Sequence, residues 1–159
     1  MKKLIVFDLD GTLADSKSPL PDKMALLLDN LLSKYRVCVM SGGTITQFEN
    51  QLLSNLKADP VRLKQLHLMP TCGTRYYIYD TEKGWTKIYA EDIADVDKKR
   101  ISKAINQGVD HFNLREEKVW GELIEDRGSQ VTYSALGQDI VTVLGEEGVK
   151  MKKAWESIF

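Results

Sequence analysis

Strand-like and helix-like segments alternate over the first third of this chain, and no other feature restricts its fold as strongly. Residues 3–8 form a short apolar run, and Pro21 begins a helical stretch. Residues 36–40 form a second apolar run, and Thr44 is a candidate N-cap for a second helix. This order with short connections predicts an α/β fold with a parallel sheet and right-handed crossovers. We expect the first run to be a strand buried on both faces, and ligands to bind at the carboxyl ends of the strands.

The second half of the chain has a different pattern. Asp59 is expected to cap a helix over 60–65, and an apolar segment follows it. Two predicted hairpins then flank a charged amphipathic helix, which we expect to stop at Gly108. These elements favour a Rossmann-like sheet domain over residues 1–85 and a small α+β unit with a tail over 86–159. The predicted segments are 67–70, hairpin 75–80 with 85–90, helix 92–107, and hairpin 122–126 with 130–136.

Composition excludes several classes of function. The 159 residues have a formal net charge of −1, which argues against a basic nucleic-acid-binding protein. No stretch approaches the roughly 20 apolar residues that span a bilayer, so we expect no membrane segment and a cytoplasmic protein without a signal peptide. The two cysteines, Cys38 and Cys72, have no metal-site spacing and are expected to be free thiols.

The polar sequence Asp8-Leu9-Asp10-Gly11-Thr12 follows the first predicted strand directly. Two carboxylates at the end of a buried strand need a cation or hydrogen bonds, because an unpaired buried charge is costly. Their oxygen atoms suit Mg²⁺, and a carboxylate beside Mg²⁺ can attack a phosphoryl group to form an aspartyl-phosphate. Gly11 would help the backbone to turn after Asp8. The alternative is a purely structural turn in which Asp10 caps local amides.

A second polar sequence, Ser41-Gly42-Gly43-Thr44, follows the second predicted strand where a helix begins. Free N–H groups at a helix start attract anions, and the Ser41 hydroxyl adds a donor. The alternative is an ordinary Ser-Gly-Gly turn before an N-cap. The two polar sequences reach the same sheet edge, which strengthens the prediction of a phosphate site.

With these motifs the chain resembles the haloacid dehalogenase-like (HAD) superfamily of Mg²⁺-dependent phosphoryl-transfer enzymes. The resemblance rests on Phe7-Asp8-Leu9-Asp10-Gly11-Thr12-Leu13 and on Val39-Met40-Ser41-Gly42-Gly43. The α+β unit is similar to the type IIB cap group, and residues 122–137 are similar to the cap hairpin of eukaryotic-type phosphomannomutases and their bacterial relatives.

The resemblance implies a role for each matching residue. Asp8 would be the nucleophile and a Mg²⁺ ligand, and Asp10 the general acid/base with its backbone carbonyl also on the metal. Ser41, Gly42 and Gly43 would hold the transferring phosphoryl group. In the cap, Arg127 and Ser134 match positions that face the substrate, although an arginine in a hairpin turn can equally be a solvated residue.

The chain departs from the family in two places. The family's later Lys motif and Gly-Asp motif have no match in residues 138–159, which predict a charged helical tail with Lys150, Lys152 and Lys153 outward and Trp155 and Phe159 inward. The sequence therefore has the pattern of a truncated, fragmentary or degenerate member. The other departure is Gln138, where phosphomannomutases of this type carry Arg.

We therefore expect hydrolysis of a small phosphomonoester, a sugar phosphate by resemblance, through an aspartyl-phosphate. The first alternative is a phosphomannomutase, and the second is a non-catalytic chain that binds phosphate or a partner. Without later core strands the sheet would have an open edge, so we also expect self-association into a homo-oligomer.

Overall fold

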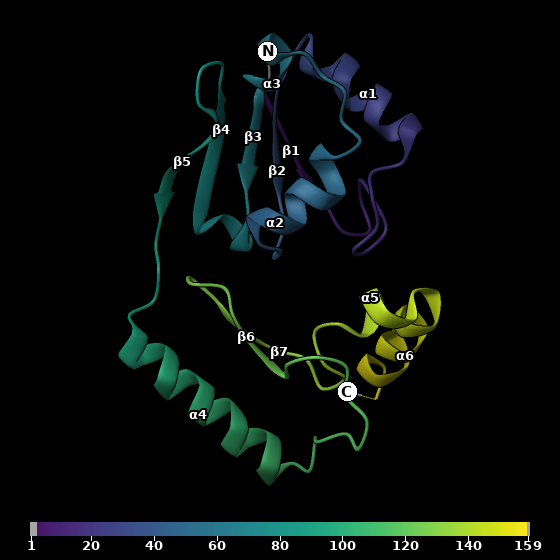
Figure 1. Cartoon of the computed structure of the whole chain (residues 1–159), viewed down its shortest axis with the longest axis vertical. Helices are drawn as coiled ribbons and strands as arrows, with labels where there is room; N and C mark the ends of the chain where they lie inside the picture. The colour runs from purple at the N-terminus through teal and green to yellow at the C-terminus, as the bar shows by residue number, and fades with distance from the viewer. Residues whose placement is uncertain (1–2, 159) are drawn as a thin grey trace. The chain divides into compact units, whose positions relative to one another are not determined.

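A five-stranded sheet occupies the first 91 residues of the computed structural model, which describes residues 3–158 (Figure 1). The first three strands are parallel, as expected, and the last two form an antiparallel hairpin on the same sheet. The order in the sheet is the order in the chain: β1 (Leu4–Asp8), β2 (Arg36–Met40), β3 (Leu66–Met69), β4 (Arg75–Asp80) and β5 (Gly84–Ala90).

Short helices connect the parallel strands. Helix α1 (Asp22–Leu32) leads to β2, and α2 (Ile45–Phe48) continues into the π-helical turn η1 (Glu49–Leu53). Helix α3 (Pro60–Leu63) is capped by Asp59, whose Oδ1 accepts the Val61 and Arg62 amides at 2.9 Å. These helices begin where the sequence predicted, although Leu27 of α1 is 55% exposed rather than buried with its neighbours.

One face of this sheet carries the hydrophobic core. Val37 and Val39 of β2 alternate with residues of the opposite face, and Leu66 and Leu68 of β3 do the same, because side chains alternate along a strand. Phe48 from α2 is fully buried in the same cluster. The remaining buried members include Leu9, Leu13, Leu20, Leu28, Leu32, Leu52 and Leu56.

The first strand is not buried on both faces, contrary to the sequence-based expectation. Leu4 is 48% exposed and Val6 56% exposed, whereas Phe7 packs against the core. The strand is at the edge of the sheet, with β2 as its neighbour. Leu4 and Val6 do not belong to the core cluster, so an apolar sequence here leaves apolar surface in solvent.

Residues 92–159 form the second unit, which contains one long helix, a hairpin and two C-terminal helices. The long helix runs through Gly108 and ends at His111, so the predicted stop was wrong; its last turns are held by the Phe112 amide on the Gly108 carbonyl at 3.0 Å. The elements are α4 (Asp95–His111), β6 (Ile124–Asp126), β7 (Val131–Tyr133), α5 (Ile140–Leu144) and α6 (Glu146–Glu156).

The tail is helical, as predicted from its composition. Trp155 is half-buried, and its Nε1 donates to Glu116 Oε1 at 2.8 Å. The predicted inward packing of Phe159 lies outside the described residues. No helix within residues 3–158 is long and apolar enough to cross a membrane.

The units meet in sequence between residues 91 and 92, six residues after the predicted boundary at 85/86. A boundary at 85/86 would cut β5, which pairs with β4 along its whole length. The predicted strand over residues 85–90 therefore belongs to the sheet of the first unit.

Candidate active site

The chain turns sharply after β1, and this turn positions two carboxylates. The Leu9 carbonyl accepts the amides of Thr12, Leu13 and Ala14 at 3.0–3.3 Å, and Leu9 itself is fully buried. Gly11 has φ 76°, the left-handed region in which glycine avoids a steric penalty. The predicted turn at Gly11 is therefore confirmed, and it allows Asp8 and Asp10 to approach the same neighbouring loop.

Asp10 is held by hydrogen-bond donors from three segments. Its Oδ2 accepts Ser41 Oγ at 3.0 Å and Gln47 Nε2 at 3.3 Å. Its Oδ1 accepts the Lys17 amide at 3.2 Å and Gln51 Nε2 at 3.3 Å. These bonds fix the carboxyl group with respect to the end of β2, as a positioned acid/base requires.

Asp8 has much looser surroundings. Its side chain is exposed, and within residues 3–158 its one hydrogen bond is a long contact of 3.4 Å from the Thr12 hydroxyl to Oδ2. A carboxylate with few hydrogen-bond partners keeps its oxygen lone pairs available to a metal ion or an electrophile. The two carboxylates therefore differ in their hydrogen bonding, with four donors on Asp10 and one long contact on Asp8.

Gln47 and Gln51 are site residues that the sequence reasoning missed. Gln51 is only 3% exposed, and its Nε2 also reaches the carbonyls of Asp15 and Ser18 at 3.3 and 3.1 Å. Gln47 Nε2 donates to Gln51 Oε1 at 2.7 Å. Their spacing of four residues on the core side of a predicted helix was the signal that could have identified them.

A pocket of about 300 Å³ contains Asp8 and the end of β2. Asp8, Ser41 and Gly42 line it, as the sequence predicted, together with Cys72 from the loop after β3. The Ser41 hydroxyl donates to Asp10 and accepts a hydrogen bond from the Gly43 amide at 3.2 Å. Gly43 thus helps to fix the orientation of the Ser41 side chain. A side chain at position 43 would collide with the Gln47 amide, which explains the second glycine. The other residues lining the pocket are Val6, Phe7 and Met40.

The loop after β3 supports the Ser41–Gly43 loop through its backbone. The Thr71 amide donates to the Gly43 carbonyl, and the Cys72 amide to the Ser41 carbonyl, both at 2.9 Å. Thr71 and Cys72 have φ values of 50° and 55°, which are unfavourable for side chains with a Cβ atom. The tertiary hydrogen bonds hold this strained conformation against the candidate phosphate loop.

The donor set at the pocket fits Mg²⁺ in part. Asp8 offers a carboxylate, and Mg²⁺ commonly uses one or two carboxylates together with water and substrate phosphate oxygens. The Asp10 carboxylate already accepts hydrogen bonds from four donors, so the expected metal ligand from Asp10 is its main-chain carbonyl. Residues 3–158 contain no group of three or more His, Cys, Asp or Glu side chains suited to a metal ion.

The two predicted site residues of the second unit have partners within that unit. Arg127 pairs with Glu125, with Nη2 at 2.7 Å and Nε at 2.9 Å from Oε2. The Ser134 hydroxyl donates to the Gly137 carbonyl at 2.9 Å. Both residues are half-buried and lie at or beside the predicted hairpin of β6 and β7.

Comparison with known proteins finds similar chains, although no protein-family model matches this sequence. A phosphomannomutase of Encephalitozoon cuniculi is 24% identical over 142 residues, which are 87% of this chain and 51% of that protein. The truncated IMP-nucleotidase of Plasmodium falciparum superposes with a TM-score of 0.61 at 17% identity, over 98% of this chain and 47% of that one.

A third similar protein is BT1666 of Bacteroides thetaiotaomicron, described as a phosphatase of the haloalkanoate (HAD) superfamily. It superposes with a TM-score of 0.50 at 13% identity, over 99% of this chain and 53% of its own. The chain thus spans about half the length of the relatives that it matches. Its five-stranded sheet, the turn after β1 and these similarities agree with one another: the chain shares the α/β fold of these proteins.

Proposed function

We propose that this chain carries the nucleophile half of a phosphomonoester hydrolase. The observation that carries the proposal is that an exposed, loosely bonded Asp8 shares one pocket with Ser41 and Gly42, while Asp10 is held by four donors beside it. The similarity to a phosphomannomutase and to HAD phosphatases supports the same chemistry.

In the proposed reaction an Asp8 oxygen attacks the phosphorus atom, and the bond from phosphorus to the ester oxygen breaks. Protonated Asp10 gives its proton to the leaving oxygen, which departs as an alcohol. The Asp10 carboxylate then takes a proton from water, whose oxygen attacks the aspartyl-phosphate and releases inorganic phosphate. Bound Mg²⁺, which Asp8 and the Asp10 carbonyl would hold, supplies charge neutralisation for the phosphoryl oxygens.

Ser41 and Gly42 would contact the phosphoryl group from the end of β2, and the Thr71–Cys72 backbone would keep that loop in place. Arg127 and Ser134 are proposed substrate contacts of the cap hairpin, in keeping with the resemblance on which they were predicted. A sugar phosphate is the proposed substrate class, supported by the similarity to a phosphomannomutase.

The decisive experiment measures inorganic phosphate release from sugar phosphates and nucleoside monophosphates, with Mg²⁺ and with excess chelator. We expect Mg²⁺-dependent release that falls at least about a thousandfold in Asp8→Asn, because the amide is not a nucleophile. Asp22→Asn, an exposed carboxylate at the start of α1, is the matched control and should retain activity. Equal release by the wild type and Asp8→Asn would contradict the proposal.

A phosphomannomutase activity is the second candidate, favoured by the similarity over 142 residues. It would convert mannose 1-phosphate to the 6-phosphate without free phosphate, which the same assay separates by product analysis. Gln138, where that family carries Arg, removes one phosphate-binding cation and favours the hydrolase.

A non-catalytic phosphate-binding chain is the third candidate. It is favoured by the metal-ligand set, since residues 3–158 bring together no group of three or more His, Cys, Asp or Glu side chains suited to a metal ion, and Asp8 is the one acidic residue among those lining the pocket. Phosphate binding without turnover, abolished in Ser41→Ala, would distinguish it from both enzymes. Homo-oligomerisation is compatible with all three candidates and is tested separately below.

A further inference from the structure

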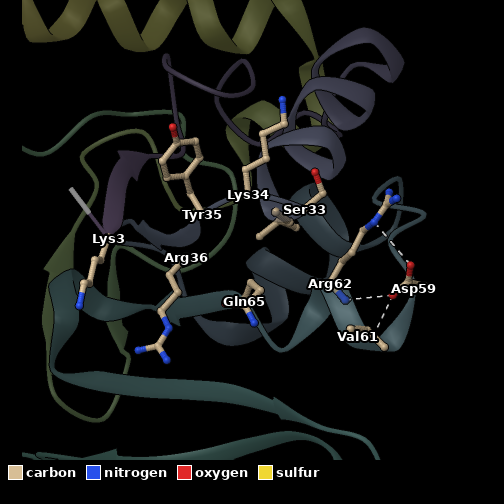
Figure 2. Close-up of a pocket in the computed structure, with 10 residues that line it drawn as sticks. Lys3, Ser33, Lys34, Tyr35, Arg36, Asp59, Val61, Arg62 and Gln65 are labelled. Atoms are coloured by element: carbon tan, nitrogen blue, oxygen red, sulfur yellow. Dashed lines mark hydrogen bonds and ion pairs between the residues drawn. The ribbon is translucent and has the colours of Figure 1, made fainter. Parts of the chain in front are cut away.

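A larger cavity lies at the opposite end of the parallel strands from Asp8. Its volume is about 670 Å³, within the range of about 300–1,000 Å³ that small-molecule sites occupy. Lys3 precedes β1 and the Ser33–Arg36 segment enters β2, so the cavity borders the amino ends of both strands. Helix α3 contributes the remaining wall (Figure 2). We call this feature the basic cavity.

Four cationic side chains line the basic cavity, against a single acidic one, Asp59. The chain as a whole has a net charge of −1, so this is a local excess of positive charge. Arg62 is neutralised, because it pairs with Asp29 and with Asp59. The other three cations, Lys3, Lys34 and Arg36, form no ion pair among residues 3–158.

Stabilisation of the fold explains only part of the positive charge at the basic cavity. Lys34 follows the C-terminus of α1, whose helix dipole attracts a cation with the equivalent of about half an elementary charge. Arg36 is the first residue of β2 and Lys3 precedes β1, so neither belongs to that helix end. Lys3 and Arg36 therefore have no oppositely charged partner within residues 3–158.

Apolar surface adjoins the cations. Tyr35 is 36% exposed and Val61 is 72% exposed, and both line the cavity. In Figure 2 the Lys3 ammonium and the Arg36 guanidinium point the same way, whereas the Lys34 ammonium points in the opposite direction. One small anion would therefore not contact all three cations at once, whereas a ligand with several anionic groups offers a separate group to each.

We propose that the basic cavity binds an organic polyphosphate, with phosphate groups on Lys3, Lys34 and Arg36 and a ring against Tyr35 and Val61. Lysine and arginine form strong charge-assisted hydrogen bonds to phosphate oxygens, and an exposed aromatic ring adds stacking surface. The Arg36 charge also reaches beyond the cavity, because together with burial it lowers the pKa of His67. The site is separate from the Asp8 pocket, and its occupancy does not depend on the proposed hydrolysis.

The test is calorimetric titration of the full chain with ATP, tripolyphosphate and adenosine, without divalent cations. We expect ATP to bind more tightly than tripolyphosphate, and adenosine to bind weakest. The double variant Lys34→Gln/Arg36→Gln should bind ATP at least about tenfold more weakly. The matched control Lys83→Gln/Lys87→Gln also removes two exposed positive charges, from the β4–β5 hairpin, and should bind as the wild type does.

A further variant separates this site from general electrostatics. Val61→Glu puts a negative charge on an exposed wall residue without removing a cation, and should weaken binding. The proposal is overturned if Lys34→Gln/Arg36→Gln binds ATP like the wild type, if both double variants lose affinity equally, or if a single-stranded oligonucleotide binds more tightly than ATP.

Discussion

Asp8 and Asp10 are two residues apart in the chain, yet their surroundings are opposite. Four donors fix Asp10, whereas Asp8 has one long contact with Thr12 among the described residues. The difference comes from Leu9, which is fully buried and makes the backbone turn between the two carboxylates. At the scale of single residues, buried Leu9 thus sets the turn between the two carboxylates, and Gln47 and Gln51 hold Asp10 by hydrogen bonds.

Replacing Gln51 with leucine should destabilise the first unit by about 2 kcal/mol, because the Asp10 carboxylate and two carbonyls lose a donor in a buried place. Leucine has a volume similar to that of glutamine, so the decrease in the free energy of unfolding reports the lost hydrogen bonds. Urea unfolding should give a lower midpoint with an unchanged m-value. Gln107→Leu on the exposed side of α4 should stay within about 0.5 kcal/mol of the wild type. A wild-type midpoint for Gln51→Leu would contradict the role given to this side chain.

His67 makes stability depend on pH. Burial, and secondarily the charge of Arg36, lowers the pKa of His67 below its ordinary value, and its Nδ1 lies 2.6 Å from the Tyr76 hydroxyl. The unfolded chain then binds a proton more readily than the folded chain. Above the unfolded pKa of about 6.5, His67 is neutral in both states and does not lower the free energy of unfolding. As the pH falls from there toward the folded pKa, the unfolded chain takes up the proton first, and the free energy of unfolding decreases.

The free energy of unfolding should accordingly fall between pH 7.5 and pH 5.5, and it should fall less in His67→Gln. Denaturant titrations at several pH values measure both slopes. His111→Gln, on α4 of the second unit, is the control for removal of a histidine and should keep the wild-type slope. A slope in His67→Gln identical to the wild type would refute this assignment.

At the scale of elements, the loop Thr71–Thr74 supports the Ser41–Gly43 loop of the candidate site. Its backbone amides bind the Ser41 and Gly43 carbonyls, and the Thr74 hydroxyl donates to Thr71 Oγ1 at 2.8 Å. Cys72 is exposed and lines the Asp8 pocket, whereas Cys38 is 4% exposed and burial raises the pKa of its thiol. The two free thiols therefore differ in access and in reactivity.

We expect N-ethylmaleimide to modify Cys72 much faster than Cys38, as peptide mass spectrometry would show. Modification should abolish phosphate release, because the adduct fills a pocket of about 300 Å³. Cys72→Ala should remain active and become resistant to the reagent. Inhibition of Cys72→Ala at the wild-type rate would assign the effect to another residue.

At the scale of the whole molecule, the sheet of the first unit is incomplete on one side. β1 forms its edge, and Leu4 and Val6 are about half exposed on the face opposite the core. Unpaired edge strands with apolar residues promote association between chains. We therefore expect the chain to self-associate through β1.

Light scattering should report a mass above 18.0 kDa for the wild type and a smaller mass for Leu4→Lys, because a charge on an edge strand opposes pairing. Leu4 is not part of the Asp8 pocket, so this variant leaves the site intact. Val96→Lys changes an equally exposed residue on α4 and should not alter the mass. A monodisperse wild-type monomer would exclude association through this edge.

Local sequence determined the order of strands and helices, the turn at Gly11 and the Asp59 cap, because each depends on nearby backbone geometry. It also indicated Asp8, Asp10 and Ser41 as a group, since parallel strands bring their carboxyl ends to one edge. It did not predict that α4 continues through Gly108, since one glycine in a long helix costs only about 1 kcal/mol. The edge position of β1 and the polar contacts of Gln47, Gln51 and Cys72 depend on segments distant in sequence. Only the tertiary structure decided these features, because hydrophobic periodicity reports which side chains prefer burial but not which elements are present to cover them.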